Sequence, residues 1–360
     1  MSDKMTSKER IDRSLRHKYT EEAGLFEHFW DETVTKYVGE KHIRENENLS
    51  EHFGLDMDLC WCLNTVLDCD FRSELIAEDE ETRTVRDGNY AIMRTMKHTT
   101  STPEHIGFSV TCYDDWKKVR DKMVFKDKRI RFDAYRKARE EAKKAERFFC
   151  LSGKNVFECL HSVAGHENLL IGMALEPDWV AEMANDFADL ILAMMKRLFE
   201  QEGLPDGVWF YEDLGFKERP FMSPAMYSEM ISPAHKKIND YLKSLDLPIV
   251  MHSCGYVAPL IPHFIEEGID CLQAMEVKAG MDVMRISQKY SDSLALMGGL
   301  DIRVLESNDK NLIDKMLSEK LPALIKKGNY VVHSDHSVPP SVEYDTLCYY
   351  FERVRHYIGR

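Results

Sequence analysis

The sequence lacks any apolar run long enough to cross a membrane. A spanning helix needs about 20 apolar residues, and the richest short run here, "LILAMM" at 190–195, is flanked by Asp189 and Lys196. The opening "MSDKMTSKER" is charged and contains no apolar segment typical of a secretory signal. We therefore expect a cytoplasmic protein without a membrane partner.

Clusters of basic residues are also missing. The 360-residue chain carries 48 Lys and Arg against 62 Asp and Glu, a net charge of −14. A surface of that sign repels phosphate backbones, so we do not expect a nucleic-acid partner. No glycine-rich phosphate-binding fingerprint accompanies Gly298-Gly299, which we interpret as a turn at the end of a strand.

The even set of cysteines typical of a disulfide scaffold is absent. The chain has nine cysteines, and an odd number in so large a chain favours a reducing compartment. Cys60 and Cys62 form a C-x-C pair that could bind a metal. Their neighbours in "DLCWCLNTVL" are mostly apolar, so we interpret the pair as part of the core.

Residues 1–147 combine helices with a hairpin. The segment 5–18, "MTSKERIDRSLRHK", predicts a short helix. Asp87-Gly88 in the middle of 82–97 predicts a β-hairpin, because both turn positions tolerate a positive φ. The segment 114–147 is rich in charge and predicts solvent-exposed helices.

From residue 148 onward, short apolar runs alternate with amphipathic helical stretches, predicted at 178–201, 224–244 and 310–327. The runs are FFCLSG (148–153), VWFYED (208–213), PIVMHSC (248–254), CLQAME (271–276), LALMGGLD (294–301) and YVVHSD (330–335). Alternating strands and helices predict a parallel sheet. With further strands upstream, we expect one α/β domain over 1–360: a (β/α)8 TIM barrel whose N-terminal part is irregular and whose main repeat region is 148–360.

Ionisable side chains end five of these six runs. The C-terminal ends of barrel strands meet at one mouth, where active sites form. Imidazole, thiolate and carboxylate together suit Zn²⁺ with one position open for substrate. We expect the metal to be bound by His252, Cys254, a residue of 333–336 and either Glu212 or a substrate atom. The full set is Glu212, Asp213, His252, Cys254, Glu276, Asp301, His333, Asp335 and His336.

These residues also have simpler interpretations. His252 could be a hydrogen-bonded core histidine and Cys254 a buried thiol, because H-x-C alone is a weak motif. Glu276 could orient a ligand histidine without touching the metal, and Asp301 could cap the following helix. Clustering at five strand ends favours the metal site.

Several stretches resemble the uroporphyrinogen decarboxylase superfamily, a group of TIM-barrel proteins. Together they span almost the whole chain, although the segment 40–145 carries no specific likeness. The stretches are "MTSKERIDRSLRHKYTEE" (5–22), "GHENLLIGMALEPDWV" (165–180), "FYEDLGFKERPFMSPAMYSEMISPAHKKI" (210–238), "VMHSCGYVAPLIPHFIEEGIDCLQAMEVKAGMD" (250–282), "MGGLD" (297–301) and "GNYVVHSDHSVPPSVEYD" (328–345).

The chain departs from the decarboxylase branch near its start. Those enzymes resemble one another in an arginine-rich loop that grips the carboxylates of a porphyrinogen. This chain has no arginine between Arg16 and Arg44, and carries Glu27, Asp31 and Glu32 there instead. Such a stretch would repel a polycarboxylate substrate.

The second branch contains zinc methyltransferases of corrinoid-dependent systems, whose motif is H-x-C followed later by a cysteine before two prolines. His252 and Cys254 match the first part, and in "SDHSVPP" His336 stands where the family has cysteine. The change keeps a zinc ligand but removes a thiolate, which suits activating an oxygen more than a thiol. The branch also implies a carboxylate from "VWFYED", which points to Glu212, with Asp213 as reserve.

The resemblance thus implies a zinc-dependent methyltransferase, the substrate-side component of an O-demethylase, that moves a methyl group from an aryl methyl ether to a cobalamin-type corrinoid on a separate protein. Asp335, Glu276 and His333 are candidates for proton transfer or for orienting ligands. A homodimer is a further candidate assembly. Two alternatives stay open: a metal-free decarboxylase or related porphyrin-type lyase, and a corrinoid-binding barrel without catalysis.

Overall fold

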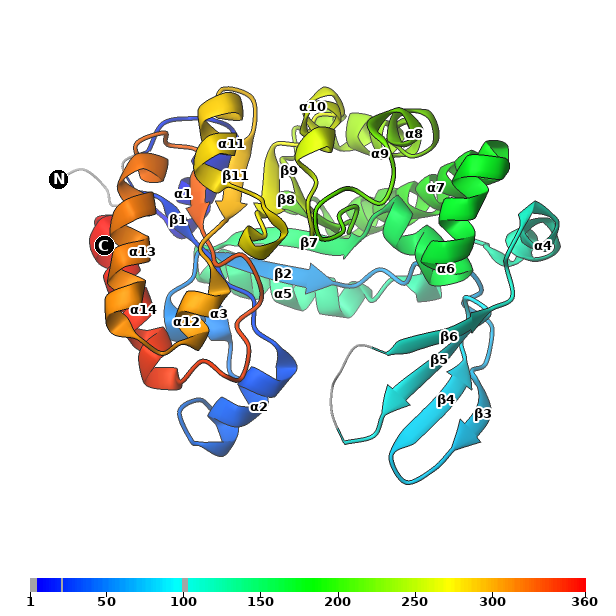
Figure 1. Cartoon of the computed structure of the whole chain (residues 1–360), viewed down its shortest axis with the longest axis horizontal. Helices are drawn as coiled ribbons and strands as arrows, with labels where there is room; N and C mark the ends of the chain where they lie inside the picture. Colours follow the sequence, from blue (N-terminus) through cyan, green and yellow to red (C-terminus); the bar gives the residue numbers. More distant parts are fainter. Residues whose placement is uncertain (1–4, 21, 99–102) are drawn as a thin grey trace.

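A curled sheet of eight parallel strands forms the centre of the computed structural model, which describes residues 5–20, 22–98 and 103–360 (Figure 1). The strands are β1 (Gly24–Leu25), β2 (Met57–Trp61), β7 (Phe148–Lys154), β8 (Gly207–Tyr211), β9 (Ile249–His252), β10 (Cys271–Ala274), β11 (Ala295–Gly298) and β12 (Tyr330–Val332). β2 pairs with β7, each strand from β7 to β12 pairs with the next, and β12 pairs with β1, so β1 and β2 are the two edges of the sheet. This is the strand order of a TIM barrel, and the six predicted apolar runs from 148 onward are all strands in it.

The two edges of the sheet meet at Asp56. The Asp56 N–H donates to the Leu25 carbonyl at 2.8 Å, and the Leu25 N–H donates to Asp56 Oδ2 at 2.8 Å. The buried carboxylate also pairs with Arg10 at 3.2 Å and Arg360 at 2.7 Å. Both partners are cations and compensate the charge of the Asp56 carboxylate. Without them, burying this carboxylate would cost stability.

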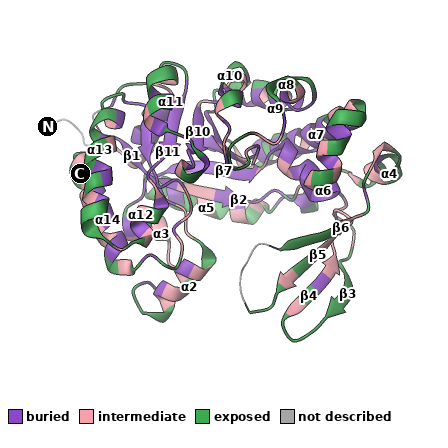
Figure 2. Ribbon diagram, in the orientation of Figure 1, coloured by how far each residue is buried: buried purple, intermediate pink, exposed green. Residues whose placement is uncertain are grey.

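Helices cover the outside of the sheet, and their inward faces are buried while their outward faces are exposed (Figure 2). They are α1 (Ser7–Leu15), α2 (Asp31–Gly39), α3 (Leu49–Phe53), α4 (Tyr113–Val119), α5 (Phe132–Lys144), α6 (Val156–Leu175), α7 (Pro177–Glu202), α8 (Pro224–Met230), α9 (Ser232–Ser244), α10 (Ile261–Glu266), α11 (Val283–Tyr290), α12 (Ile302–Glu306), α13 (Lys310–Ile325) and α14 (Tyr344–Tyr357). Short 3₁₀ turns are η1 (Arg120–Lys122), η2 (Asp127–Arg129), η3 (Ala258–Leu260) and η4 (Val277–Ala279). No helix among the described residues is long and apolar enough to cross a membrane.

The predicted helices differ from the observed ones mainly at one break. The helices expected at 178–201 and 310–327 are α7 and α13, with ends shifted by one or two residues. The single helix expected at 224–244 is two helices, α8 and α9, which meet at Ile231. Pro233 lies in the first turn of α9, and because proline has no backbone N–H it cannot continue the hydrogen bonds of α8.

A second, antiparallel sheet is inserted after β2. It consists of β3 (Glu74–Glu78), β4 (Thr82–Arg86), β5 (Ala91–Met96) and β6 (Glu104–Phe108). β4 and β5 form a hairpin, but the positive φ falls on Tyr90 (58°) and not on Gly88. Gly88 is needed because a Cβ there would lie 2.5 Å from the Asp68 carbonyl oxygen.

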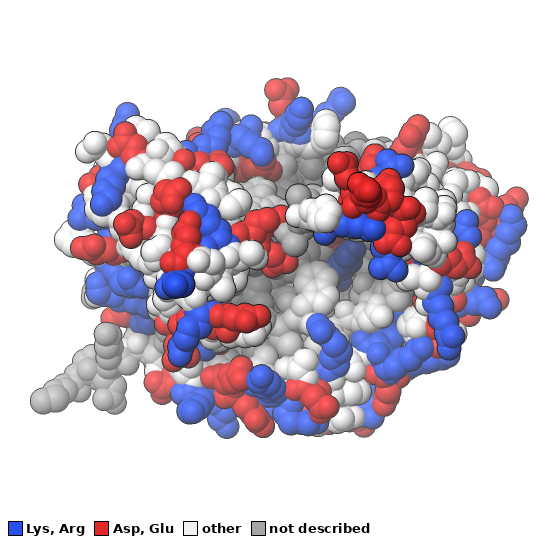
Figure 3. All heavy atoms as spheres, turned by 90° about the horizontal axis from the view of Figure 1, so that it is seen from below, with Lys and Arg blue, Asp and Glu red and all other residues white. Residues whose placement is uncertain are grey.

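Two segments flank the mouth of the barrel. The β3–β6 sheet follows the C-terminal end of β2, and α2 follows that of β1, so both project from the same end, as two separate arms in Figure 1. Seen from the side on which these arms lie, the surface has a hollow near its middle (Figure 3). The strand ends that carry the predicted site residues therefore open into an accessible recess.

Candidate metal centre

Three side chains from two neighbouring strand ends place metal-binding atoms together. Asp213 follows β8, while His252 and Cys254 lie at and just after the end of β9. Their ligand atoms all lie within 4.8 Å of one another, which makes them the candidate metal group of the described residues. His252 Nε2 lies 3.3 Å from Cys254 Sγ and 3.4 Å from Asp213 Oδ1.

These spacings fit a tetrahedral zinc ion. With bonds of about 2.3 Å to sulfur and 2.0–2.1 Å to nitrogen or oxygen, tetrahedral angles place neighbouring ligand atoms about 3.3–3.6 Å apart. The Nε2–Oδ1 distance of 3.4 Å matches its tetrahedral value, the Nε2–Sγ distance of 3.3 Å lies at the short end of the range, and the third pair lies within 4.8 Å. Three protein ligands leave a fourth position free, which is the pattern of a catalytic zinc site. The side chains of Asp213 and His252 are 42% and 17% exposed, so an ion can enter from solvent.

Gln273 fixes which nitrogen of His252 faces the other two ligands. Gln273 lies on β10, is 1% exposed, and accepts a hydrogen bond from His252 Nδ1 through its Oε1. A proton on Nδ1 leaves the Nε2 lone pair directed at Asp213 and Cys254. This is the partner that a metal-binding histidine requires.

The electrostatics of the group favour a cation. Burial alone would raise the pKa of Asp213, but the hydrogen bond and charge of His252 outweigh it and lower that pKa to about 2. Burial disfavours charged His252, yet Cys254 and Asp213 outweigh it and hold the imidazole pKa well above its usual value. Burial raises the pKa of the Cys254 thiol. The Asp213 carboxylate, which loses its proton readily, thus attracts positive charge to the group.

The turn that carries Cys254 is held against the end of β8. The Cys254 N–H donates to Asp213 Oδ1 at 2.8 Å, and the Gly255 N–H donates to Glu276 Oε2 at 2.7 Å. Gly255 has a φ of 75°, and a Cβ there would lie 2.4 Å from the backbone of Gly215. Only glycine allows this approach. Glu276 therefore braces the ligand turn.

The structure corrects the predicted carboxylate ligand, because Glu212 points away from the metal group. Its oxygens accept from the N–H groups of Phe157 (2.8 Å) and Glu158 (3.0 Å) at the start of α6, and from His235 Nε2 at 2.5 Å. Adjacent residues at a strand end face opposite sides. The inward position therefore belongs to Asp213, the reserve candidate.

His336 also lies outside the metal group. Its ring stacks on Trp30 with 5.8 Å between centroids, and it lines a separate recess of about 340 Å³ with Glu276 and Asp335. The Asp335 oxygens accept from Val277 N–H at 2.8 Å and Ile302 N–H at 2.7 Å, so Asp335 joins two loops. Asp301 caps α12, as the simpler of its two interpretations predicted.

His333 lies deeper in the barrel. It is fully buried, and its Nε2 lies 2.9 Å from His28 Nδ1. Burial lowers the pKa of His333 to about 3 and also lowers that of His28, so both rings are neutral at pH 7. His28 Nε2 lies 3.0 Å from the Tyr211 hydroxyl. These residues form the floor beneath the metal group.

Sequence reasoning missed Gln273, His28 and Tyr211. Tyr211 links the floor to the metal group, because its ring lies 5.2 Å from the ring of His252. The alternation of side chains along β8 and β10 could have placed Tyr211 and Gln273 inside the barrel. Nothing in the sequence pattern reveals that Gln273 contacts His252, since that contact depends on the register between β9 and β10.

Comparison with known proteins identifies the family and the fold. The chain is similar to a methyltransferase from Methanosarcina mazei, with a TM-score of 0.71, 13% identity, and coverage of 99% of this chain and 100% of that one. A Xaa-Pro dipeptidase with bound methionine in the active site matches at a TM-score of 0.31 and 11% identity, over 63% of this chain and 61% of that one, too weakly to bear on the fold. No curated protein matches the chain. The family model for uroporphyrinogen decarboxylase (URO-D) matches residues 108–357, more than half of the chain, and the protein therefore belongs to the uroporphyrinogen decarboxylase family.

Proposed function

We propose that this protein is a zinc-dependent methyltransferase that takes a methyl group from an aryl methyl ether and passes it to a Co(I) corrinoid on a separate protein. The observation that carries the proposal is the group Asp213, His252 and Cys254, spaced for a tetrahedral ion at the mouth of the barrel. The family and the fold shared with a methyltransferase support it.

The reaction balances without an added oxidant. The bond between the ether oxygen and the methyl carbon breaks, and its electron pair stays on the oxygen. The electron pair of Co(I) forms the new bond to carbon, which makes the cobalt formally Co(III). Bound zinc would supply a Lewis acid that lowers the energy of the leaving oxygen anion. That oxygen then needs a proton.

Glu276 is the best placed of the proposed proton carriers. It lines a recess of about 210 Å³ together with Cys254 and Gly255, so its carboxyl group reaches the same space as a ligand of the metal. Asp335 has both oxygens occupied by backbone N–H groups, whereas Glu276 accepts one, from Gly255, and its Oε1 lies 3.6 Å from Lys278 Nζ. His333 is buried below the site. We assign proton delivery to Glu276, while Asp335 and His333 hold the surrounding loops and floor.

The arrangement near the start of the chain argues against decarboxylation of a porphyrinogen. Glu27 is 2% exposed and accepts hydrogen bonds from Ser334 and Tyr350, so this stretch holds the barrel together and offers no cationic grip. A corrinoid-binding barrel without catalysis would not need three ligands spaced for an ion.

The test measures metal content and methyl transfer on the same purified protein. We expect about one zinc per chain and transfer from methoxybenzene to free Co(I) cobalamin, followed by the cobalamin spectrum. Cys254→Ala should lose both zinc and transfer, whereas the matched control Cys348→Ala, a half-buried thiol on α14, should keep both. Full zinc and full activity in Cys254→Ala would refute the proposal.

A further inference from the structure

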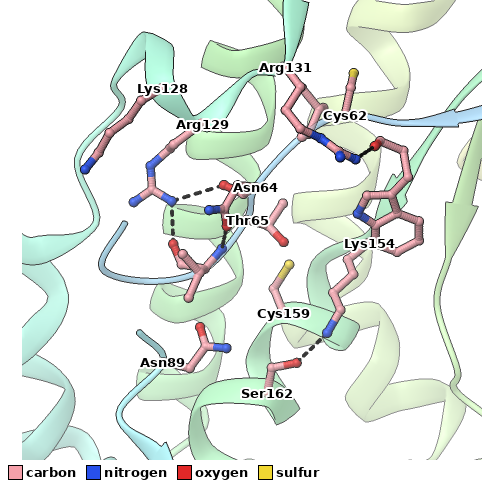
Figure 4. Close-up of a pocket in the computed structure, with 13 residues that line it drawn as sticks. Cys62, Asn64, Thr65, Asn89, Lys128, Arg129, Arg131, Lys154, Cys159 and Ser162 are labelled. Atoms are coloured by element: carbon pink, nitrogen blue, oxygen red, sulfur yellow. Dashed lines mark hydrogen bonds between the residues drawn. The ribbon is translucent and has the colours of Figure 1, made fainter. Parts of the chain in front are cut away.

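A further pocket is lined by cations. It has a volume of about 450 Å³ and is lined by Trp61 and Lys154, the last residues of β2 and β7, and by Asn89 in the turn between β4 and β5 (Figure 4). Its charged side chains are Lys128, Arg129, Arg131 and Lys154. Hydrogen-bonding groups of Asn64, Asn89 and Ser162 also line it. Four cations around one pocket are unexpected in a chain with a net charge of −14.

Two of the four cations are already used by the fold. Lys128 pairs with Asp70 at the rim. Arg129 is buried and donates to the carbonyl oxygens of Asn64 (3.1 Å) and Leu67 (2.8 Å), so it holds the loop after β2. These contacts explain why both residues are present.

The other two cations have no carboxylate partner among the described residues. Arg131 donates to the carbonyl oxygen of Trp61, and Lys154 Nζ donates to Ser162 Oγ at 2.8 Å. Neither acceptor carries a charge, and both cations face the same pocket (Figure 4). An ammonium and a guanidinium left uncompensated in a recess attract an anion, and the planar guanidinium matches a carboxylate well.

Strand register connects this pocket to the metal group. Lys154 on β7 pairs with Tyr211 on β8, and Tyr211 pairs with His252 on β9. Registered neighbours point to the same side of a sheet. Lys154 therefore lies two strand spacings, about 10 Å, from the metal-binding histidine. That span can hold a benzene ring with a charged group at one end and an ether at the other.

Aromatic side chains line the span. Trp61 lines the cationic pocket, is 42% exposed, and its ring lies 5.2 Å from that of Tyr211. The Tyr211 ring lies another 5.2 Å from the ring of His252. A planar aromatic substrate placed along Trp61 and Tyr211 would stack or pack edge-on against both rings.

We propose that Arg131 and Lys154 bind a carboxylate on the aromatic methyl donor, so that the preferred substrates are methoxybenzoates. This inference rests on the proposed function for the reaction, but the carboxylate subsite can be tested without it. Two free cations match one carboxylate, which distinguishes such a donor from a porphyrinogen with many.

The test separates binding from catalysis. Benzoate has no methyl group to transfer, and its binding to the purified protein can be followed by calorimetry. We expect Lys154→Gln and Arg131→Gln each to weaken benzoate binding about tenfold or more, because each removes a hydrogen bond to a charged group. Lys128→Gln, a rim cation already paired with Asp70, should leave benzoate affinity unchanged. Arg131 is exposed, so its variant keeps the test valid where Lys154→Gln does not fold.

Methyl transfer gives the second readout. Arg131→Gln should raise KM for 4-methoxybenzoate about tenfold or more, whereas Lys128→Gln should leave that KM unchanged. Benzoate affinity equal in all three variants and the parent protein would overturn the subsite, even if methoxybenzene is demethylated. If both variants lose benzoate binding and the parent protein transfers methyl from no donor, the proposed function is refuted but the carboxylate subsite is supported. Inorganic phosphate binding more tightly than benzoate would overturn the carboxylate assignment in favour of a phosphorylated ligand.

Discussion

Gln273 offers the sharpest test of the candidate metal centre, because it lies outside the metal group and contacts it through His252. Its Oε1 accepts from His252 Nδ1, and the side chain is 1% exposed. Gln273→Met keeps the length of the side chain but removes the acceptor. The imidazole then loses the contact that holds its Nε2 toward Asp213 and Cys254.

The expected cost follows from the kind of contact removed. Loss of the hydrogen-bonding partner of a metal-binding histidine weakens metal affinity about 10–100-fold, which corresponds to about 1.4–2.7 kcal/mol. The zinc Kd would be measured by competition with a chromophoric chelator at fixed pH. Gln288→Met, at an exposed position on α11, is the matched control and should leave the zinc Kd unchanged.

One result would refute this reasoning. If Gln273→Met binds zinc as tightly as the parent protein while His252→Ala loses it, the imidazole is oriented by something other than Gln273. If both variants keep full affinity, the ion is not bound by His252 at all.

Three further predictions concern neighbouring features. Asp213→Asn should weaken zinc binding at least about tenfold, whereas Glu212→Gln should keep zinc and lower the Tm, since Glu212 caps α6; the opposite pattern would restore the original ligand assignment. Gly255→Ala should lower the Tm and the zinc affinity, while Gly39→Ala, where a Cβ meets nothing within 4 Å, should change neither; equal Tm values would contradict the tight turn. Burial raises the pKa of Glu27 to about 8, against 4.5 in the unfolded chain, so the native state holds a proton that the unfolded state has lost. Stability should therefore fall by up to about 1.4 kcal/mol per pH unit between pH 5 and 8, and Glu27→Gln should flatten that slope in urea titrations; a slope unchanged by the substitution would place the titrating group elsewhere.

The six strands from β7 to β12 could be predicted from the sequence because each is a short apolar run followed by polar residues, whereas β1 and β2 show no such run. Buried parallel strands need apolar side chains on both faces, and the alternation with amphipathic helices sets the strand direction. The seam at Asp56 could not be predicted. It brings together Arg10 and Arg360 from opposite ends of the chain, and no local pattern encodes that meeting.

The metal group was only partly predictable. His252 and Cys254 are two residues apart at the end of β9, so alternation predicts that they point the same way. The choice between Glu212 and Asp213 depends on where β8 ends and the chain turns, and a shift of one residue reverses the side that each faces. His336 lies four residues beyond β12, in a loop whose path is set by its own contacts.

If the proposed function holds, the row of Lys154, Tyr211 and His252 across three neighbouring strands sets the length of the accepted donor. The backbone keeps adjacent strands about 4.8 Å apart, so the distance between the cation and the proposed ion would change only in whole steps. Relocating the positive charge by one strand would shorten or lengthen the accepted donor by one such step. Barrels of this design could thus be re-sized for new ethers through a single exchanged pair of side chains, with the metal left in place.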